Sequence, residues 1–177
     1  MKKLFLFLVF LTSFGFLPAQ DQPKEDRIQW MTIEEMEEAN TKEPRKIIID
    51  VYTDWCGWCK RMDKTTFQNP EIVRYINENY YAVKLDAEQK ENINFKETEY
   101  AFVAKGRRGY HELAASLLQG RMSYPSIVYL DENLDMIQPI PGYKDAKQME
   151  EIVKYIGGNH YKTTEYDAFL AEFESAL

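Results

Sequence analysis

The clearest apolar pattern in the chain lies at residues 46–52, Lys-Ile-Ile-Ile-Asp-Val-Tyr, where apolar and β-branched residues occupy both faces of a short segment. This pattern is typical of a central strand that is buried between helices. Residues 80–85 have a similar character and predict a second strand. Residues 126–130 and 136–140 predict an antiparallel hairpin, because a short polar turn, Asp-Glu-Asn at 131–133, separates them.

Capping residues mark where the helices begin. Thr32 and Glu35 form a capping box, which predicts a helix over 33–40. Asn69 and Pro70 supply a cap and a proline at the first helical position of another helix. Together with the apolar spacing, these signals predict helices at 33–40, 56–67, 70–77 and 145–156, and a short terminal helix that begins at Thr164.

The order of these elements predicts an α/β fold with a central mixed sheet, helices on both of its faces and an extra C-terminal helix. The segment 86–123 is an insertion before the predicted hairpin, and it is much longer than the dozen or so residues that a crossover between parallel strands needs. We therefore expect it to have structure of its own. A small hairpin is expected within 93–103, and a helix is expected at 109–118 with Gly120 as its stop.

The first nineteen residues have the layout of a secretory signal peptide. Two lysines precede an apolar run at 4–11, and a stretch rich in small residues leads to Ala19, after which we expect cleavage. The run is about half as long as the roughly 20 residues that a membrane-spanning helix requires, and an uncleaved anchor is the alternative. We expect residues 20–31 to be flexible, residues 32–177 to form one domain, and the protein to be exported to a bacterial periplasm.

The charge balance argues against nucleic acid as a partner. The chain has 22 Lys and Arg against 29 Asp and Glu, a formal net charge of −7 at pH 7, and an acidic protein repels a phosphate backbone. One dense basic group is present, Lys105 with Arg107 and Arg108, and it is too short to form a binding stripe. We interpret it as a solvated loop.

The chain has two cysteines, Cys56 and Cys59. A disulfide between them closes a very short loop, and short loops stabilise a fold least, so the pair is better explained by chemistry than by stability. A structural zinc site requires four ligands, and neither His111 nor His160 lies at the sequence distance from the cysteines that is typical of zinc ligands. We expect both histidines at the surface, no metal, and no cofactor besides a redox-active Cys56–Cys59 disulfide, with an inert bridge as the alternative.

Cys56 lies where the strand at 46–52 gives way to the helix at 56–67. There the helix dipole and unpaired backbone N–H groups favour the thiolate, and cysteines so placed have pKa values of about 3.5–7.5 instead of about 8.5. Cys59 lies one turn further along the same helix face, within reach of a mixed disulfide formed at Cys56. We therefore predict that Cys56 attacks and that Cys59 resolves.

Asp50 lies between Ile49 and Val51 in the predicted central strand. Asp is almost never fully buried without a partner or a purpose, so we interpret Asp50 as a functional acid. Burial disfavours the carboxylate and predicts a raised pKa. A strand-end acid that reaches solvent is the alternative.

Residues 47–60, Ile-Ile-Ile-Asp-Val-Tyr-Thr-Asp-Trp-Cys-Gly-Trp-Cys-Lys, resemble the strand, active-site loop and helix start of the thioredoxin superfamily. The resemblance covers about 32–158 and is greatest to small exported bacterial thioredoxin-like proteins, some described as disulfide isomerases. It implies a thioredoxin-like fold in which Asp50 lies beneath the resolving Cys59 and helps to move its proton. Thioredoxin has proline at the position of Trp58, so its reduction potential does not carry over.

The resemblance also implies roles for other residues. Lys84 matches a lysine that approaches the buried acid, and an edge-facing lysine is the alternative. Tyr124 and Pro125 resemble a cis-proline loop that presents its backbone to an extended substrate, where the residues alone favour a trans proline. Gly142 matches a glycine beside the substrate groove, and a helix-entry turn explains it equally well. The substrate-binding residues implied in this way are Trp55, Gly57, Trp58, Tyr124, Pro125 and Gly142.

The function that follows is thiol-disulfide exchange on protein or peptide disulfides outside the cytoplasm, as a reductase or an isomerase. Such an enzyme needs electrons, and the resemblance implies a membrane thiol-electron donor as a partner. Two alternatives stay open: an oxidase that donates its disulfide, and a binding or chaperone module that recognises partners through the 86–123 insertion. The sequence specifies neither the clients nor the oligomeric state.

Overall fold

The computed structural model describes residues 26–106 and 108–177. The predicted signal peptide at 1–19, the start of the segment predicted to be flexible, and Arg107 lie outside the described residues. None of the helices in the described part combines the length and the apolar character that a membrane crossing requires.

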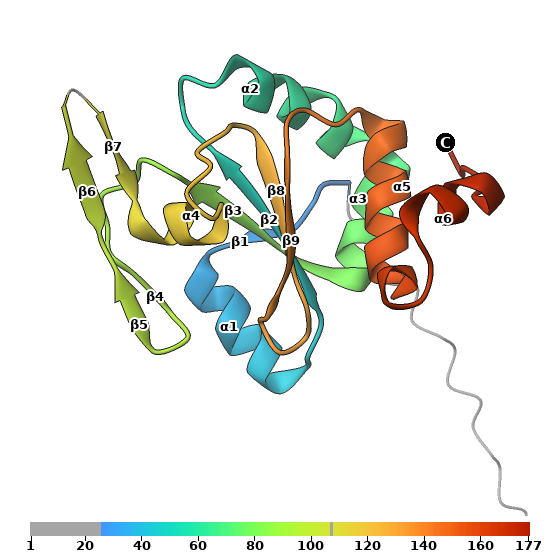
Figure 1. The fold of residues 1–177 in the computed structure, drawn as a ribbon, viewed down its shortest axis with the longest axis horizontal. Coiled ribbons are helices and arrows are strands. Elements are labelled where there is room, and N and C mark those ends of the chain that lie inside the picture. The colour runs from blue at the N-terminus through green and yellow to red at the C-terminus, as the bar shows by residue number, and fades with distance from the viewer. Residues whose placement is uncertain (1–25, 107) are drawn as a thin grey trace, which may run out of the picture.

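A mixed sheet forms the centre of the fold, as the sequence predicted, and it has five strands (Figure 1). Its strands, from one edge to the other, are β1 (Trp30–Met31), β3 (Tyr80–Asp86), β2 (Lys46–Tyr52), β8 (Ser126–Leu130) and β9 (Met136–Pro141). The first three are parallel, while β8 runs antiparallel to both β2 and β9. The strand β2 is therefore paired on both sides, which is the central position that its apolar pattern predicted.

Helices cover both faces of this sheet (Figure 1). They are α1 (Ile33–Lys42), α2 (Gly57–Lys64), α3 (Pro70–Asn79), α4 (Glu112–Leu117), α5 (Ala146–Gly157) and α6 (Tyr166–Glu172), with short 3-10 turns at Thr66–Gln68 and His160–Lys162. The predicted caps at the starts of α1 and α3 are both present, and Asp145 and Gln148 form a capping box at the start of α5. The predicted helix at 56–67 is in fact two pieces, because α2 ends at Lys64 and a 3-10 turn follows.

The core has two halves, one on each face of the sheet. Ile47, Ile49 and Val51 pack into the half that α1 and α4 cover. Ile48 packs into the other half, with residues of α2, α3 and α5. Because side chains alternate along a strand, Asp50 shares the face of Ile48 and points toward the α2 side. This alternation brings an acid of the central strand toward the helix that carries the cysteines.

The insertion at 86–123 folds as two hairpins and a helix. β4 (Ile93–Phe95) pairs with β5 (Thr98–Tyr100), and β6 (Phe102–Lys105) pairs with β7 (Arg108–His111), which leads into α4. The hairpins lie at the side of the sheet away from α5 and α6 (Figure 1). A hairpin within 93–103 was predicted, and its strands end at Tyr100.

The helix predicted at 109–118 is wrong at its start. Gly109 to His111 belong to β7, and α4 begins only at Glu112. Gly109 lies directly against the Phe102 ring, where a Cβ would come within 2.1 Å of the ring edge. The strand pairing across β6 and β7 therefore sets this conformation, and glycine permits the close contact.

His111 is another correction, because it is fully buried rather than at the surface. Its Nδ1 accepts a hydrogen bond from the Leu113 amide at the start of α4, and its Nε2 lies 3.1 Å from the carbonyl oxygen of Glu91. Burial lowers the pKa of His111, which favours the neutral ring that can accept one bond and donate the other. His160 is exposed, as predicted.

The two ends of the domain also differ from the predictions. The segment 20–31 was predicted to be flexible, but Trp30 and Met31 form β1 and pair with Ala82 and Val83 of β3. At the other end, the cap position of α6 is occupied by Glu165 rather than by Thr164. The first difference comes from pairing between segments that are distant in the sequence. The second is a shift of one residue at a helix end, which local patterns do not resolve.

Candidate functional site

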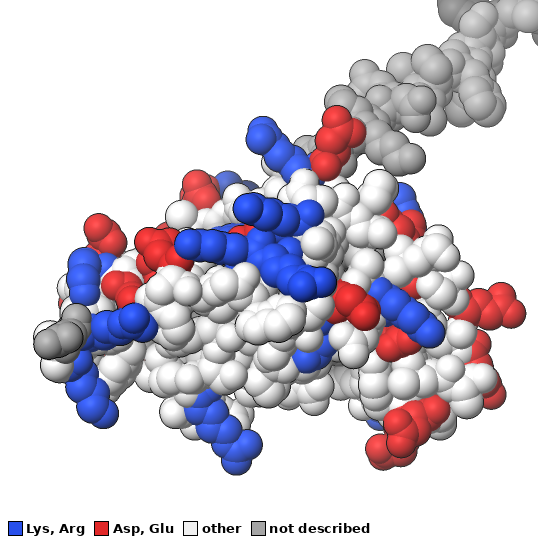
Figure 2. All heavy atoms as spheres, turned by 90° about the horizontal axis from the view of Figure 1, so that it is seen from above, with Lys and Arg blue, Asp and Glu red and all other residues white. Residues whose placement is uncertain are grey.

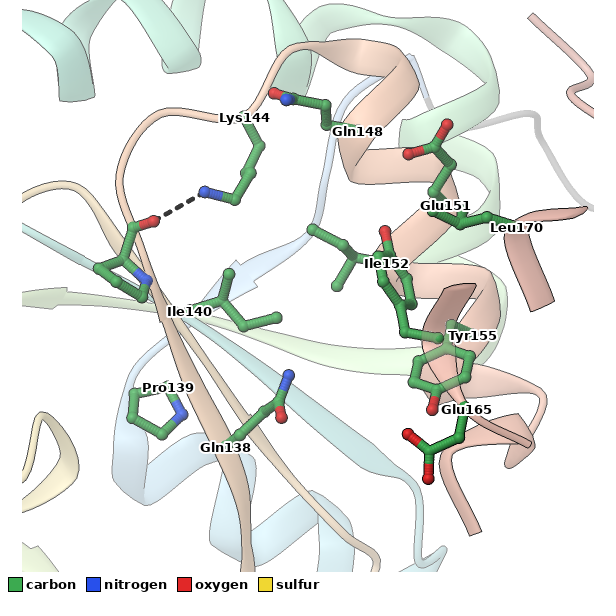
Figure 3. A pocket seen from close by; sticks show the side chains of 12 residues that line it. Gln138, Pro139, Ile140, Lys144, Gln148, Glu151, Ile152, Tyr155, Glu165 and Leu170 are labelled. Atoms are coloured by element: carbon green, nitrogen blue, oxygen red, sulfur yellow. Dashed lines mark hydrogen bonds between the residues drawn. The ribbon is translucent and has the colours of Figure 1, made fainter. Parts of the chain in front are cut away.

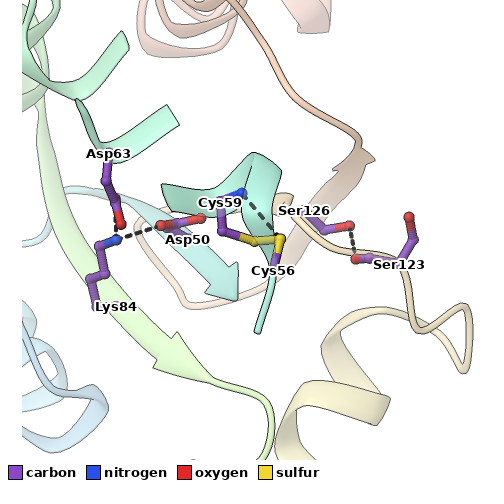
Figure 4. The surroundings of a disulfide bond; sticks show 7 residues. All are labelled: Asp50, Cys56, Cys59, Asp63, Lys84, Ser123 and Ser126. Atoms are coloured by element: carbon purple, nitrogen blue, oxygen red, sulfur yellow. Dashed lines mark hydrogen bonds and ion pairs between the residues drawn. A yellow bond between two sulfur atoms is a disulfide. The ribbon is translucent and has the colours of Figure 1, made fainter. Parts of the chain in front are cut away.

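The cysteine pair lies at the start of α2, directly after the central strand β2. Cys56 occupies the N-cap position, and its Sγ accepts a hydrogen bond from the Cys59 amide at 3.1 Å. The two residues form a disulfide with their Cα atoms 5.3 Å apart (Figure 4). Both are largely covered, with Cys56 5% exposed and Cys59 1% exposed. Cys56 is thus the more accessible of the two.

The start of α2 favours a negative charge on Cys56 once the disulfide is reduced. The helix dipole places partial positive charge at this end, and the Cys59 amide already points at the Cys56 sulfur. The first turn of α2 contains no acidic residue to oppose this effect. A thiolate is the form that attacks disulfides, so the geometry supports Cys56 as the attacking residue and Cys59 as the resolving residue.

A buried ion pair lies behind the cysteines. Asp50 is fully buried, and Lys84 Nζ lies 2.9 Å from one of its carboxylate oxygens. Neither carboxylate oxygen of Asp50 makes a hydrogen bond of good geometry with any of the described residues. Burial raises the pKa of Asp50 to about 6, and the nearby Lys84 opposes part of that rise. In the view of Figure 4, Asp50 lies between Lys84 and Cys59, which is the place that the resemblance implied for the acid and the lysine.

Asp63 completes this cluster and was missed in the sequence. It lies on α2 and contacts the same Lys84 ammonium group (Figure 4). The signal that could have revealed it is its spacing: Asp63 follows Cys59 by four residues, so the two share one face of the helix. The ring of Trp30 in β1 also lies over the Lys84 ammonium, 5.1 Å from it. The rings of Tyr52 and Phe67 lie 4.9 and 5.9 Å from the same group, so Lys84 is held between two carboxylates and three rings.

We expect Asp63→Asn to lower the pKa of Asp50 from its value of about 6. The charge of Asp63 repels the Asp50 carboxylate and also competes for Lys84, so its removal favours the ionised form in both ways. The measurement is a carboxyl carbon NMR titration of Asp50. Asp54→Asn is the matched control, because Asp54 is exposed and forms no ion pair with Lys84. An unchanged or raised pKa would contradict the shared-lysine account.

The loop between α4 and β8 lies beside the cysteines. The peptide bond between Tyr124 and Pro125 is cis, as the resemblance implied. The amide of Gly142 donates a hydrogen bond to the Pro125 carbonyl at 2.8 Å, and Gly142 has a φ of +86°, which favours glycine. At the end of the same loop, Ser126 donates a hydrogen bond to the Ser123 carbonyl (Figure 4). Gly142, which directly follows β9, thus holds the cis-proline loop in place through this hydrogen bond.

Two tryptophans expose large apolar surfaces next to the disulfide. Trp55 is 51% exposed and Trp58 is 56% exposed. Trp55 packs edge-on against Tyr124 with ring centroids 6.0 Å apart, and Trp58 packs against Tyr143 at 5.3 Å. Gly57, between them, has no neighbouring atom within 4 Å of the position of an added Cβ. The other large hydrophobic side chains that the described residues expose are Met136 and Leu177. Tyr143 was missed, although it directly follows the predicted Gly142.

The described residues contain no cluster of three or more His, Cys, Asp or Glu that could hold a metal ion. A cavity of about 690 Å³ lies between β9 and the helices α5 and α6 (Figure 3). Its lining includes Ile140, Lys144, Tyr155 and Glu165, but neither cysteine. The Lys144 ammonium is occupied by the Pro141 carbonyl at 2.7 Å (Figure 3). The cysteine pair therefore lies at the α2 end and outside this cavity.

Comparison with known proteins identifies the domain. The family model described as a thioredoxin-like domain matches residues 33–157. A solved structure of a thioredoxin-fold protein from Helicobacter pylori aligns with a TM-score of 0.56 at 18% identity, over 85% of this chain and 89% of that chain. A likeness at this identity concerns the fold.

Curated relatives match over short segments. Spermatogenesis-associated protein 20 of Mus musculus is 38% identical over 53 residues, which are 30% of this chain and 7% of that protein. The thiol:disulfide interchange protein DsbD of Escherichia coli is 34% identical over 59 residues, 33% of this chain and 10% of that protein. The chain thus aligns with only a small part of the length of these relatives.

The residues matched by the family model include the buried Asp50, the cysteine pair, the cis-proline loop and Gly142, and leave out only Trp30 of the site described above. The mixed sheet with helices on both faces is the fold that the resemblance implied. This chain belongs to the thioredoxin-like family.

Proposed function

We propose that this protein is a thiol-disulfide oxidoreductase that reduces or isomerises disulfides of exported proteins. The observation that carries the proposal is the position of Cys56: it caps the start of α2, bonded to Cys59, with the exposed Trp55 and Trp58 on either side. The similarity to a protein named for thiol:disulfide interchange supports thiol proteins as partners.

The exchange proceeds in two steps that balance atoms and electrons. The Cys56 thiolate forms a bond to one sulfur of the client disulfide, and the other client sulfur leaves as a thiolate and takes up a proton. Cys59 then loses its proton and attacks Cys56, which releases the second client sulfur. The client gains two electrons and the protein ends with its Cys56–Cys59 disulfide, the state seen in this structure.

Asp50 is proposed as the group that accepts the proton of Cys59. A pKa of about 6 lies close to neutral pH, and a general base works best when its pKa is near the working pH. Lys84, which pairs with Asp50, also contacts Asp63, whose side chain is 38% exposed. The cluster thus connects the buried acid with a carboxylate at the protein surface.

Renewed turnover requires a donor that reduces the disulfide again. We propose a membrane thiol-electron donor acting outside the cytoplasm, in keeping with the N-terminal segment that resembles a signal peptide. The exchange needs no cofactor other than the cysteine pair.

A measured reduction potential tests the direction of the reaction. The protein is equilibrated with glutathione buffers, and the fraction of reduced protein is followed by tryptophan fluorescence, since Trp55 and Trp58 flank the disulfide. A reductase is expected near about −270 mV and a strong oxidase near about −120 mV. A reduction potential near about −120 mV would mean that the protein donates its disulfide to clients, and the proposal of a reductase would then be wrong. Full biological activity in a variant that lacks both cysteines would replace it with a binding module.

A further inference from the structure

The insertion carries an arginine to one side of the disulfide. Arg108 begins β7, and its guanidinium carbon lies 4.3 Å from the centroid of the Trp55 ring. Trp55 in turn packs against Tyr124 of the cis-proline loop. The sequence had suggested a solvated loop for this basic group, but Arg108 is in contact with the active-site tryptophan. The β6–β7 hairpin therefore contributes to the surface around Cys56.

A second arginine has the same arrangement on the other side of the disulfide. The guanidinium carbon of Arg61, on α2, lies 5.3 Å from the centroid of Trp58 and 5.7 Å from that of Tyr143. A guanidinium group that lies over a ring still presents N–H groups at its outer edge, and these match the two oxygens of a carboxylate. Each exposed tryptophan thus has an arginine stacked on it.

Neither Arg61 nor Arg108 has a carboxylate partner within the described residues, where the ion pairs involve other basic side chains. Both are exposed. Figure 2 views the molecule from the side of α2 and shows Lys and Arg side chains over the middle of this face and near the end of the β6–β7 hairpin, with Asp and Glu side chains among and around them. The chain as a whole has a net charge of −7, so the two unpaired guanidinium groups are local positive charges on an acidic protein.

Acidic groups limit where a negative ligand can lie. Burial raises the pKa of Tyr124 to about 12, and the negative charges of Glu88 and Asp86 nearby add to the rise. Asp54 is exposed directly before Trp55 in the sequence. A ligand carboxylate is therefore repelled from the Tyr124 hydroxyl and attracted to the outer edges of the guanidinium groups.

We propose that Arg61 and Arg108 select clients whose disulfide is flanked by acidic residues. An extended client segment places its cystine at Cys56, its apolar groups on the two tryptophans, and a carboxylate on the arginine at either side. This inference rests on the proposed function and adds the substrate class. It also gives a purpose to the β6–β7 hairpin, which brings Arg108 to a site that α2 and the cis-proline loop build without it.

The test compares two synthetic peptides that contain one intramolecular disulfide, with Glu beside both cysteines in one and Lys in the other. The rate constant for reduction by the reduced protein is measured for each peptide. Exposed ion pairs are worth up to about 1 kcal/mol, or about fivefold each, so the Glu peptide is expected to react about five- to twenty-fold faster at low salt. The ratio should fall toward one at 1 M salt, where charges are screened within about 3 Å.

Charge reversal then locates the effect. Arg108→Glu is expected to lower the Glu-to-Lys rate ratio at least about fivefold, and Arg61→Glu likewise. Lys105→Glu is the matched control. Lys105 lies opposite Arg108 in the strand register of the same hairpin, and it makes no ring contact with Trp55. It is expected to keep most of the wild-type ratio.

The outcomes separate this inference from the proposed function. Reduction of the neutral bis(2-hydroxyethyl) disulfide by the wild-type protein measures the exchange chemistry alone. If that disulfide is reduced while both peptides react at equal rates, client selection is overturned and the proposed function stands. An equal loss of preference in Lys105→Glu and Arg108→Glu would also overturn it, since the effect would then come from net charge. A protein that reduces no disulfide overturns both.

Discussion

Cys59→Ser is expected to hold client proteins in stable mixed disulfides through Cys56, whereas Cys56→Ser captures none. In the first variant the attacking thiolate remains and no thiol is left to release the client. In the second, the remaining Cys59 is 1% exposed and lies inside the first turn of α2. The measurement is electrophoresis without reductant after acid quenching and alkylation, with the trapped clients identified by mass spectrometry.

The size of this difference follows from the thiolate fraction. A thiol pKa near 6 in place of about 8.5 raises the thiolate fraction at pH 7 about thirtyfold. Alkylation rates of the two single-cysteine variants, measured against pH, should show a low pKa for Cys56 and an ordinary or higher one for Cys59. Equal trapping, or equal alkylation profiles, would remove the basis for the two roles.

The cysteine site could be predicted because everything that positions it is local. The apolar strand, the cap at Cys56 and the spacing to Cys59 lie within fifteen consecutive residues, 46–60. Burial of Asp50 was also predictable, since an acid inside a strand with apolar residues on both faces has no route to solvent. Local sequence thus specifies the position of the cysteine pair and of the buried acid.

The surroundings of the site could not be predicted, because they depend on contacts between distant segments. Arg108 contacts Trp55 because the β6–β7 hairpin brings these two distant segments together, and Lys84 of β3 contacts Asp63 of α2 because these two elements lie next to each other. His111 looked like a surface residue, since its neighbours in sequence do not reveal the carbonyl of Glu91 that it contacts. Tertiary packing decides such positions, and propensity alone does not.

Asp50→Ala is expected to stabilise the protein at neutral pH. The pKa of Asp50 rises from 3.8 to about 6 in the fold, chiefly through burial. Because the folded-state pKa is the higher one, the proton on Asp50 stabilises the fold fully below pH 3.8, and this stabilisation is lost as the pH rises through about 6. The shift corresponds to about 3 kcal/mol at pH 7 and to less than about 1 kcal/mol at pH 4.

Unfolding in urea at pH 7 and at pH 4 measures this effect. Asp50→Ala should raise the free energy of unfolding by about 1–3 kcal/mol at pH 7, where the small cavity left by the side chain offsets part of the gain, and by much less at pH 4. Lys84→Met is measured alongside, because Lys84 opposes the rise in the pKa of Asp50. In Lys84→Met, the free energy of unfolding should therefore fall more between pH 4 and pH 7 than it does in the wild-type protein.

The same variant is expected to be slower in catalysis although it is more stable. If Asp50 takes the proton of Cys59, its removal should slow release of the mixed disulfide about a hundredfold or more at pH 7, while capture by Cys56 keeps its rate. The two steps are separated by stopped-flow fluorescence of Trp55 and Trp58 with a single equivalent of client. The slow release should recover at high pH, where Cys59 ionises without help. A variant that is less stable at pH 7 and releases clients at the wild-type rate would make Asp50 a structural partner of Lys84 and no more than that.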